Sequence, residues 1–522
     1  MLINTISIKG LRGFTKETKI SFAIPDKEHP GSGLTVLVGP NNSGKSTLIE
    51  AFHLLSINKL TIPKTSRNYI DDNVFIQATE TNGNTLTIES TPNKGAFIQR
   101  KEGGQVLDKY IDSSFKAFIL TNKRSFASTF NSNEFDRDNY HSNVGREEYR
   151  NENNINSNFG GRLLNIYNNR KEFDDCLKKI LNPVPDWTIE ARDGNNSYLE
   201  FSFHNIKHSS KEAGDGYINI FNIIDALYDS SENNVILIDE PEISLHPDLQ
   251  RKLFNLLVEY SKDKQIIIST HSPYFVDWNV FTEYGKVIRL KKEKDDINSY
   301  ELTQTTKEAM KKLLKNANNP HILSLNSNEV FFLNDNVILT EGQDDVICYK
   351  EIFKQYNFEY DASFFGWGVG GAENVNTILK VLNDLGYRKV FTILDNDKKD
   401  DIEKHKKVFP MYDFYAIATN DVHNKTDDKM NKIIKKVSKM KFDENAKNEV
   451  LSLLEKNADN KEGLVTDRKN YTINSKYEDD IKCLIDKIRG YFFNDNSSED
   501  GSSYSTDIDI LLDREERKAK KY

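Results

Sequence analysis

The chain has 522 residues, and this length predicts roughly two to four domains. Hydrophobic residues make up 37% of it and charged residues 29%, and no apolar run approaches the roughly 18–20 residues of a membrane span. The net charge of −9 excludes a protein coated in basic surface, although a local basic groove for nucleic acid stays compatible with it. Three scattered cysteines without metal spacing, and a start without a signal-peptide pattern, predict a cytoplasmic protein with no membrane partner.

The first third of the chain predicts strands followed by a phosphate-binding turn. Residues 3–8 and 18–22 have strand patterns, and the apolar strand 34–38 leads into a glycine-containing loop and a helix over 47–55. Residues 70–120 predict strands joined in hairpins. The polar and partly helical stretch from about 125 to 205 is interpreted as an insertion with a candidate role in dimerisation.

The middle of the chain alternates strands and helices. A strand over 235–238, a helix over 247–260 and a strand over 265–269 predict a parallel α/β sheet. A second α/β pattern begins near residue 331 and has strands and helices at 337–340, 344–356, 364–369, 375–385 and 390–394. Helices are predicted beyond it at 428–440, 445–456 and 478–492, followed by a polar tail over 494–505.

The loop after the strand 34–38 matches the P-loop pattern Gly-x-x-x-x-Gly-Lys-Ser. Its glycines let backbone N–H groups turn towards phosphates, and the start of the following helix supplies a favourable field. Lys45 is expected to reach the β- and γ-phosphates of ATP, and the Ser46 hydroxyl is expected to bind Mg²⁺. The residues of this segment predicted to contact the nucleotide are Gly39, Asn41, Asn42, Ser43, Gly44, Lys45, Ser46 and Thr47.

Two later strands end in residues that suit the same nucleotide site. Asp239 ends one apolar strand and is predicted to complete the Mg²⁺ shell, while the adjacent Glu240 is placed to orient the attacking water. His271 follows the next strand, and an imidazole at the carboxyl edge of a parallel sheet can contact the γ-phosphate. Glu240 and His271 are therefore the predicted catalytic residues of ATP hydrolysis.

Carboxylates follow two strands of the second α/β pattern. Glu341 and Asp345 follow one strand, and Asp395 and Asp397 follow another. Carboxylates gathered at one sheet edge repel one another unless a divalent cation lies between them, and Mg²⁺ or Mn²⁺ prefers such oxygen ligands. Two such ions could activate water and stabilise the leaving oxygen of a phosphodiester.

The N-terminal part resembles the ABC-type ATPases of the SMC and OLD-nuclease group. The resemblance rests on Ile8-Lys9-Gly10-Leu11-Arg12-Gly13-Phe14, the P-loop, Asp239-Glu240-Pro241-Glu242-Ile243-Ser244-Leu245-His246-Pro247 and Ser269-Thr270-His271-Ser272-Pro273. It implies that Arg12 lies near the nucleotide, that residues 244–246 form the D-loop, and that two protomers sandwich ATP head-to-tail. Ala213-Gly214-Asp215-Gly216 is either the counterpart of the signature motif or a plain glycine-rich turn.

The second pattern, with Gly366-Trp367-Gly368-Val369-Gly370-Gly371 between its acidic motifs, resembles a Toprim domain. In that family Glu341 would be the acid/base or metal residue, and Asp345, Asp395 and Asp397 would be metal ligands. An ATPase followed by a Toprim domain is the layout of the OLD (overcoming lysogenization defect) nucleases, including antiphage nucleases of the Gabija and retron-associated kinds. The family's further acidic residue has no clear counterpart among Asp413, Asp421, Asp427 and Asp428.

The expected architecture is α/β: an ABC-type P-loop ATPase domain over 1–330, then a smaller Toprim domain with a helical C-terminal extension over 331–522. The expected function is an ATP-dependent, Mg²⁺- or Mn²⁺-dependent DNA endonuclease in antiphage defence. The alternative is an ATP-driven sensor or assembly protein with an inactive Toprim domain. A Toprim-type topoisomerase or primase is weaker, because the first would need a strand-passing Tyr domain and the second a zinc module, for which no Cys/His set exists.

DNA and a second copy of the chain are the expected partners. The dimer could be part of a larger homo-oligomer. A reverse transcriptase with its RNA–DNA product, or another protein of a defence operon, is a further candidate partner. The lysine-rich stretches 398–407 and 425–441 are either solvated helix faces or phosphate contacts.

Overall fold

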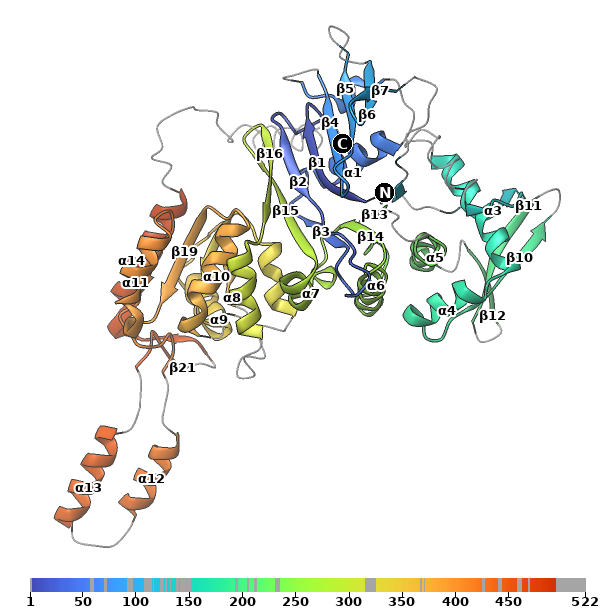
Figure 1. Ribbon diagram of the computed structural model, residues 1–522. Helices are drawn as coiled ribbons and strands as arrows, with labels where there is room; N and C mark the ends of the chain where they lie inside the picture. The colour runs from blue at the N-terminus through green and yellow to red at the C-terminus, as the bar shows by residue number, and fades with distance from the viewer. Residues whose placement is uncertain are drawn as a thin grey trace, which may run out of the picture. The chain divides into compact units, whose positions relative to one another are not determined.

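The computed structural model describes residues 2–56, 61–69, 73–91, 97–107, 115, 117–122, 126, 129–131, 133–137, 140, 152–192, 196–203, 206–210, 214–230, 235–314, 325–366, 369, 371–424, 428–439, 444–457, 462–467 and 470–493 (Figure 1). The chain forms two compact units, one of residues 1–347, 362–390 and 407–411 and one of residues 348–361, 391–406 and 412–522. No helix in the described part is long and apolar enough to cross a membrane.

The P-loop belongs to a mainly parallel sheet. Its strands are β3 (Leu34–Val38), β8 (Ala117–Leu120), β13 (Val235–Asp239), β14 (Gln265–Ser269), β15 (Lys286–Glu293) and β16 (Asp296–Glu301). Their order is β16-β15-β3-β14-β13-β8, and only β16 runs antiparallel to its neighbour. Every residue of β3, β13 and β14 is buried, as expected for parallel strands covered on both faces.

A second sheet is antiparallel. It consists of β1 (Ile3–Lys9), β2 (Thr18–Ser21), β4 (Phe75–Glu80), β5 (Thr85–Ser90), β6 (Ile98–Glu102) and β7 (Gln105–Val106) in the order β2-β1-β4-β5-β6-β7. The hairpins predicted for 70–120 are present in β4 to β7. The prediction is wrong for β8, which instead pairs in parallel with β13, because its alternating pattern does not specify its partner.

Helix α1 (Lys45–Ser56) lies between these two sheets (Figure 1). Nine of its twelve residues are buried. Leu48 and Phe52 share one hydrophobic core with Ile8 of β1 and with Leu237 of β13. Burial of this helix on both sides fixes the start of α1, and with it the end of the P-loop.

The predicted insertion folds as helices beside a small sheet. Its helices are α3 (Glu152–Asn168) and α4 (Lys171–Ile180), and its strands are β9 (Phe130–Asn131), β10 (Asp186–Arg192), β11 (Asn196–Phe203) and β12 (Ile206–Ser209). The helical part of the stretch from about 125 to 205 consists of two helices, since the chain turns at residues 169–170. Helices α5 (Asp215–Tyr228) and α6 (Pro247–Tyr260) follow, then α7 (Trp278–Glu283) and α8 (Gln304–Leu314).

A four-stranded sheet corresponds to the second α/β pattern. Its strands are β17 (Asn336–Leu339), β18 (Ser363–Phe365), β19 (Lys389–Leu394) and β20 (Asp413–Ala416), in the order β18-β17-β19-β20. Helices α9 (Gln343–Gln355), α10 (Ala372–Asp384) and α11 (Asp401–Val408) alternate with these strands. The strand predicted over 364–369 ends at Phe365, and the next residue, Gly366, comes close to the backbone of Gly342.

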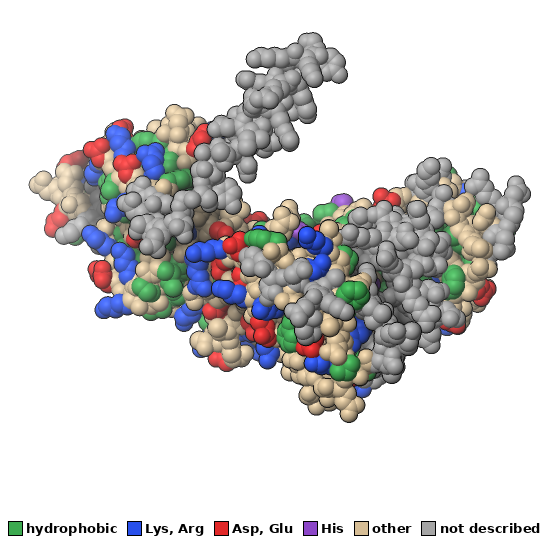
Figure 2. Space-filling view, turned by 90° about the horizontal axis from the view of Figure 1, so that it is seen from above, with side chains coloured by type: hydrophobic (Ala, Val, Ile, Leu, Met, Phe, Trp, Pro, Cys, Tyr) green, Lys and Arg blue, Asp and Glu red, His purple; other side chains and the backbone are tan. Residues whose placement is uncertain are grey.

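The C-terminal helices are present where they were predicted. They are α12 (Asp428–Ser438), α13 (Glu444–Asn457) and α14 (Glu478–Phe493), with a small hairpin of β21 (Val465–Asp467) and β22 (Thr472–Ile473) before α14. Helices α12 and α13 pack as a pair (Figure 1). The predicted polar tail 494–505 lies outside the described residues. On the face shown in Figure 2, Lys and Arg side chains are interspersed with Asp and Glu.

Candidate functional site

The P-loop backbone adopts conformations that require glycine at two positions. Gly39 has φ +141°, and a Cβ there would lie 2.2 Å from the Leu290 carbonyl oxygen of β15. Gly44 has φ +99°, and a Cβ there would lie 2.6 Å from the Ile297 side chain of β16. Both positions therefore combine a left-handed backbone with a close neighbour, which only glycine accommodates.

Lys45 folds back over the loop that precedes it. Its Nζ donates hydrogen bonds to the carbonyl oxygens of Gly39 (2.8 Å) and Pro40 (3.0 Å). Burial lowers the pKa of Lys45 to about 8, against the opposing effect of Asp239 and other carboxylates. The ammonium group is thus held inside the loop whose N–H groups would surround a phosphate.

Ser46 and Asp239 lie 193 positions apart in the sequence and are in contact in the structure. The Ser46 hydroxyl donates to Asp239 Oδ2 at 3.1 Å, and the Ser269 hydroxyl donates to Asp239 Oδ1. Asp239 is 2% exposed. A hydroxyl and a carboxylate converging at a P-loop form an oxygen donor set that fits Mg²⁺. Ser269 was not predicted, although a polar residue ending an apolar strand signals a function at that strand end.

Glu240 and His271 lie at the same sheet edge. The Glu240 backbone has φ +50°, and its N–H donates to the Ser269 carbonyl oxygen at 2.9 Å. Partial burial and the charge of Lys45 lower the pKa of His271, against the charges of Glu240 and Asp239. The structure therefore groups Lys45, Asp239, Glu240 and His271 closely enough for their charges to interact.

Glu242 connects the two segments that carry Glu240 and His271. Its Oε1 accepts a hydrogen bond from the His271 backbone N–H at 2.7 Å. Burial raises the pKa of the Glu242 carboxyl. No role was predicted for this residue, since its partner lies 29 positions away and the sequence does not show the contact.

The Arg12 side chain contacts helix α1 through an ion pair. Its guanidinium forms an ion pair with Glu50 at 2.7 Å, and its backbone N–H donates to the Ser66 carbonyl oxygen. Glu50 lies on α1, five positions after Lys45. The contact of Arg12 with a nucleotide remains a prediction, as do the nucleotide contacts of Asn41, Asn42, Ser43 and Thr47.

The signature-like loop lies against the turn that follows Glu240. Gly214 has φ +81° and directly precedes α5. A Cβ on Gly216 would lie 2.6 Å from the Ser244 carbonyl oxygen. Ala213, the first residue of the predicted motif, lies outside the described residues.

The first acidic motif of the second pattern consists of the loop after β17 and the first turn of α9, which contains Asp345. Asp345 Oδ2 accepts from the Gly342 backbone N–H at 2.9 Å, and the Glu341 carbonyl accepts from the Gly371 N–H at 3.0 Å. A Cβ on Gly366 would lie 2.4 Å from the Gly342 carbonyl oxygen. Close approach of backbones, predicted for the intervening glycines, is thus present at Gly366. Trp367, Gly368 and Gly370 lie outside the described residues.

The second acidic motif directly follows β19, the neighbour of β17 in the sheet. Asp395 precedes a short 3₁₀ turn, and Asp397 forms an ion pair with Lys398 at 3.5 Å. Of the additional acidic residues, Asp421 is 3% exposed, and Asp427 lies outside the described residues. Among the residues that the structure describes, no group of three or more His, Cys, Asp or Glu side chains is arranged to hold a metal ion.

Two family models match the chain in the expected order. Residues 34–277 match an AAA domain described as a putative AbiEii toxin of a type IV toxin–antitoxin system. Residues 332–397 match the Toprim domain of proteins like the overcoming lysogenization defect protein. The chain therefore combines a P-loop ATPase domain with an OLD-like Toprim domain in one α/β protein.

Two curated relatives that match part of the chain are named as nucleases. The chain is 35% identical to the OLD nuclease of Thermus scotoductus over 160 residues, which cover 28% of this chain and 29% of that protein. It is 31% identical to the endonuclease GajA of Bacillus cereus over 174 residues, which cover 33% of this chain and 28% of that protein. The chain thus spans less than a third of the length of either relative.

Solved structures with a detectable likeness include heads of SMC proteins. An SMC head bound to the C-winged helix domain of ScpA is 13% identical, with a TM-score of 0.43 over 60% of this chain and 100% of that one. The SMC head domain from Thermotoga maritima is 14% identical, with a TM-score of 0.36 over 58% of this chain and 100% of that one.

Proposed function

We propose that the chain is an ATP-binding and ATP-hydrolysing, divalent-metal-dependent DNA endonuclease of the OLD family that acts in antiphage defence. The observation that carries the proposal is the hydrogen bond between Ser46 and Asp239 at the end of the P-loop, in a chain that also has an OLD-like Toprim domain. The names of its relatives, an OLD nuclease and an endonuclease, support the same reaction.

In the nucleotide site, each proposed role follows from the position of a side chain. Lys45 lies inside the P-loop and would neutralise phosphate charge, while Ser46 and Asp239 would hold Mg²⁺. Glu240 would orient the attacking water, and His271 would contact the γ-phosphate. A bound Mg²⁺ would supply neutralisation of the charge that develops on the phosphates.

In the Toprim domain, Glu341, Asp345, Asp395 and Asp397 are proposed to hold Mg²⁺ or Mn²⁺ and to act on DNA. Support comes from the adjacency of β17 and β19, because one acidic motif directly follows each strand. Hydrolysis of a phosphodiester there would use water activated by the metal ions. We place the boundary between the two domains near residue 330, and propose that ATP controls cleavage through a head-to-tail dimer.

The proposal is tested with plasmid and linear DNA, Mg²⁺ or Mn²⁺, and reactions with and without ATP. Glu341→Ala is expected to reduce cleavage roughly a hundredfold or more, and to leave ATP turnover intact. Lys45→Ala is expected to abolish ATP turnover, because it removes the cation of the P-loop. Glu351→Ala is the matched control, since this α9 carboxylate forms an ion pair with Lys354 in the same helix.

Cleavage that survives Glu341→Ala would contradict the assignment of the Toprim site. ATP turnover without DNA cleavage under every condition would contradict the nuclease and would point to an ATP-driven sensor or assembly protein. A candidate activator, such as a reverse transcriptase with its RNA–DNA product, is added to the same reactions before that conclusion is drawn.

A further inference from the structure

The turn of residues 241–244, which directly follows Glu240, is held by one side chain of α5. Asn219 Nδ2 donates hydrogen bonds to the carbonyl oxygens of Pro241 (3.0 Å) and Ile243 (2.8 Å). Asn219 is 2% exposed, so both bonds are shielded from water. A single amide group therefore fixes two peptide groups of this turn, across 22 and 24 positions of sequence.

The turn has a backbone conformation that must be imposed by its surroundings. Glu240 has φ +50° and Ser244 has φ +59°, both in the left-handed region that is unfavourable for a non-glycine residue. Within the turn, Ile243 N–H donates to the Glu240 carbonyl at 3.3 Å. Helix α5 also contacts the turn at Gly216, whose missing side chain leaves room for the Ser244 carbonyl oxygen. The fit between helix and turn therefore involves two separate points on α5.

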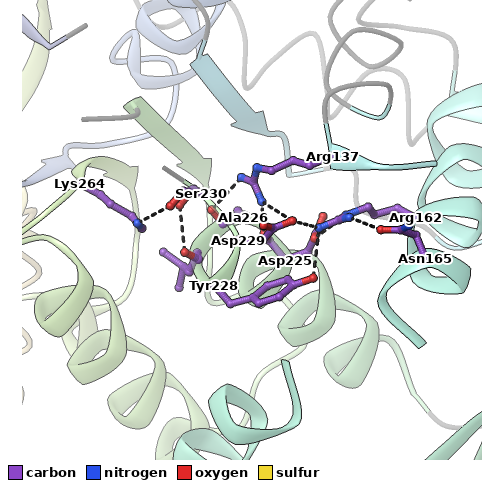
Figure 3. Close-up of polar contacts among 10 residues, drawn as sticks. Arg137, Arg162, Asn165, Asp225, Ala226, Tyr228, Asp229, Ser230 and Lys264 are labelled. Carbon is purple, nitrogen blue, oxygen red and sulfur yellow. Dashed lines mark hydrogen bonds and ion pairs between the residues drawn. The ribbon is translucent and has the colours of Figure 1, made fainter. Parts of the chain in front are cut away.

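Helix α5 is itself fixed at its other end by a buried ionic network (Figure 3). Arg162 of α3 forms an ion pair with Asp225 at 2.9 Å, and these side chains are 2% and 1% exposed. Arg162 also bonds to Asp229 and Tyr228, and Arg137 donates to the Asp225 carbonyl oxygen at 2.9 Å. Because α5 is anchored in this way, the amide of Asn219 has a defined place from which to hold the turn.

We propose that Asn219 is a positioning residue for ATP hydrolysis, which acts by holding the turn that directly follows Glu240. The proposal rests on the proposed ATPase function of this site. Glu240 can orient water only if its carboxylate lies within hydrogen-bonding reach of that water. Displacement of a catalytic group by about 1 Å can reduce a rate a hundredfold. Asn219 holds the turn rather than the P-loop, so its loss lowers kcat more than it raises KM for ATP.

The test compares ATP turnover in Asn219→Ala, Asn219→Leu and Asn222→Ala. Asn219→Leu keeps a side chain of similar volume but removes the N–H donor. A loss shared by both Asn219 variants is therefore not caused by a cavity. Asn222 is the matched control, since it lies on the same helix, is 8% exposed, and donates to the Ile218 carbonyl oxygen within α5. Both Asn219 variants are expected to lose at least tenfold in kcat with KM changed less than about threefold, and Asn222→Ala is expected to behave like wild type.

A second readout follows the turn directly. Amide hydrogen exchange without nucleotide is expected to be faster at residues 242–245 in both Asn219 variants, and unchanged there in Asn222→Ala. Turnover at the wild-type rate in either Asn219 variant that folds, or an equal loss in Asn222→Ala, would overturn the positioning role and leave the ATPase assignment standing. Absence of ATP turnover in the wild type would overturn the proposed function, and the role of Asn219 with it.

Discussion

The carboxyl group of Glu242 is largely buried, and burial makes its ionisation unfavourable. Burial raises its pKa above the ordinary value of 4.5, and its Oε1 accepts from the His271 backbone N–H. The folded state therefore binds the proton more tightly than the unfolded state does. Stability contributed by this group is full below pH 4.5 and is lost as the pH rises through the folded-state pKa.

The substitution Glu242→Gln tests this predicted dependence of stability on pH. Glutamine keeps an oxygen acceptor for the His271 N–H and carries no charge, so the variant is expected to melt at a higher temperature than wild type at pH 7. The difference should shrink as the pH falls towards 4, where the wild-type carboxyl is also neutral. Thermal unfolding of both proteins without nucleotide, from pH 4 to pH 8, measures it. A difference that does not change with pH would show that burial of the charge is not its cause.

At the scale of elements, α3 and α5 are joined by a buried ion pair rather than by apolar contacts alone. Asp225→Leu removes the buried carboxylate of the pair and leaves the Arg162 guanidinium only the partly exposed Asp229 as an ionic partner, so it is expected to cost about 3 kcal/mol in the free energy of unfolding. The double replacement Arg162→Met with Asp225→Leu should recover most of that loss, because both charges are removed together. Urea unfolding of Asp225→Leu, Arg162→Met and the double variant gives the values, and simple additivity of the two single costs would contradict a coupled pair.

An exposed ion pair provides the comparison. Asp175 and Lys178 on α4 lie 2.7 Å apart, and both side chains are more than half exposed. Solvent weakens such a pair, so Asp175→Ala is expected to leave the free energy of unfolding close to the wild-type value. A large loss in this variant would mean that the unfolding assay reports general damage to the insertion.

Strand β15 contacts two segments that lie far apart in the sequence, one at Gly39 and one at Tyr387. Its Leu290 carbonyl lies against Gly39 of the P-loop, and its Arg289 guanidinium stacks on the Tyr387 ring with 4.1 Å to the ring centroid. Arg289 also donates to the Leu385 carbonyl oxygen at 3.0 Å. One strand therefore contacts both the P-loop and the segment after α10, which belongs to the matched Toprim region.

At the scale of the whole molecule, the proposed head-to-tail dimer predicts that ATP changes the state of association. Glu240→Gln is expected to bind ATP and turn it over slowly, so the ATP-bound dimer should accumulate, with an apparent Kd for dimerisation at least tenfold lower than without nucleotide. Lys45→Ala should show no such change, since its P-loop lacks the phosphate-binding cation. Sedimentation velocity with ATP, with ADP and without nucleotide measures this, and equal association in all three conditions would contradict the dimer model.

The sequence by itself determined the local framework of this protein. Strands β3, β13 and β14 and helices α1 and α6 were predicted, because each is a continuous apolar or amphipathic run. The P-loop was also predicted from the sequence, since its glycines, lysine and serine lie within one short segment.

Only the tertiary structure decided which distant residues meet. The alternating pattern of β8 did not show that it joins the parallel sheet, because alternation specifies a buried face and not a partner strand. The contacts of Asp239 with Ser269, and of the 241–244 turn with Asn219, depend on strand order and helix packing across 20 to 30 positions of sequence. Those contacts arrange the residues around Glu240, and no local pattern in the chain encodes them.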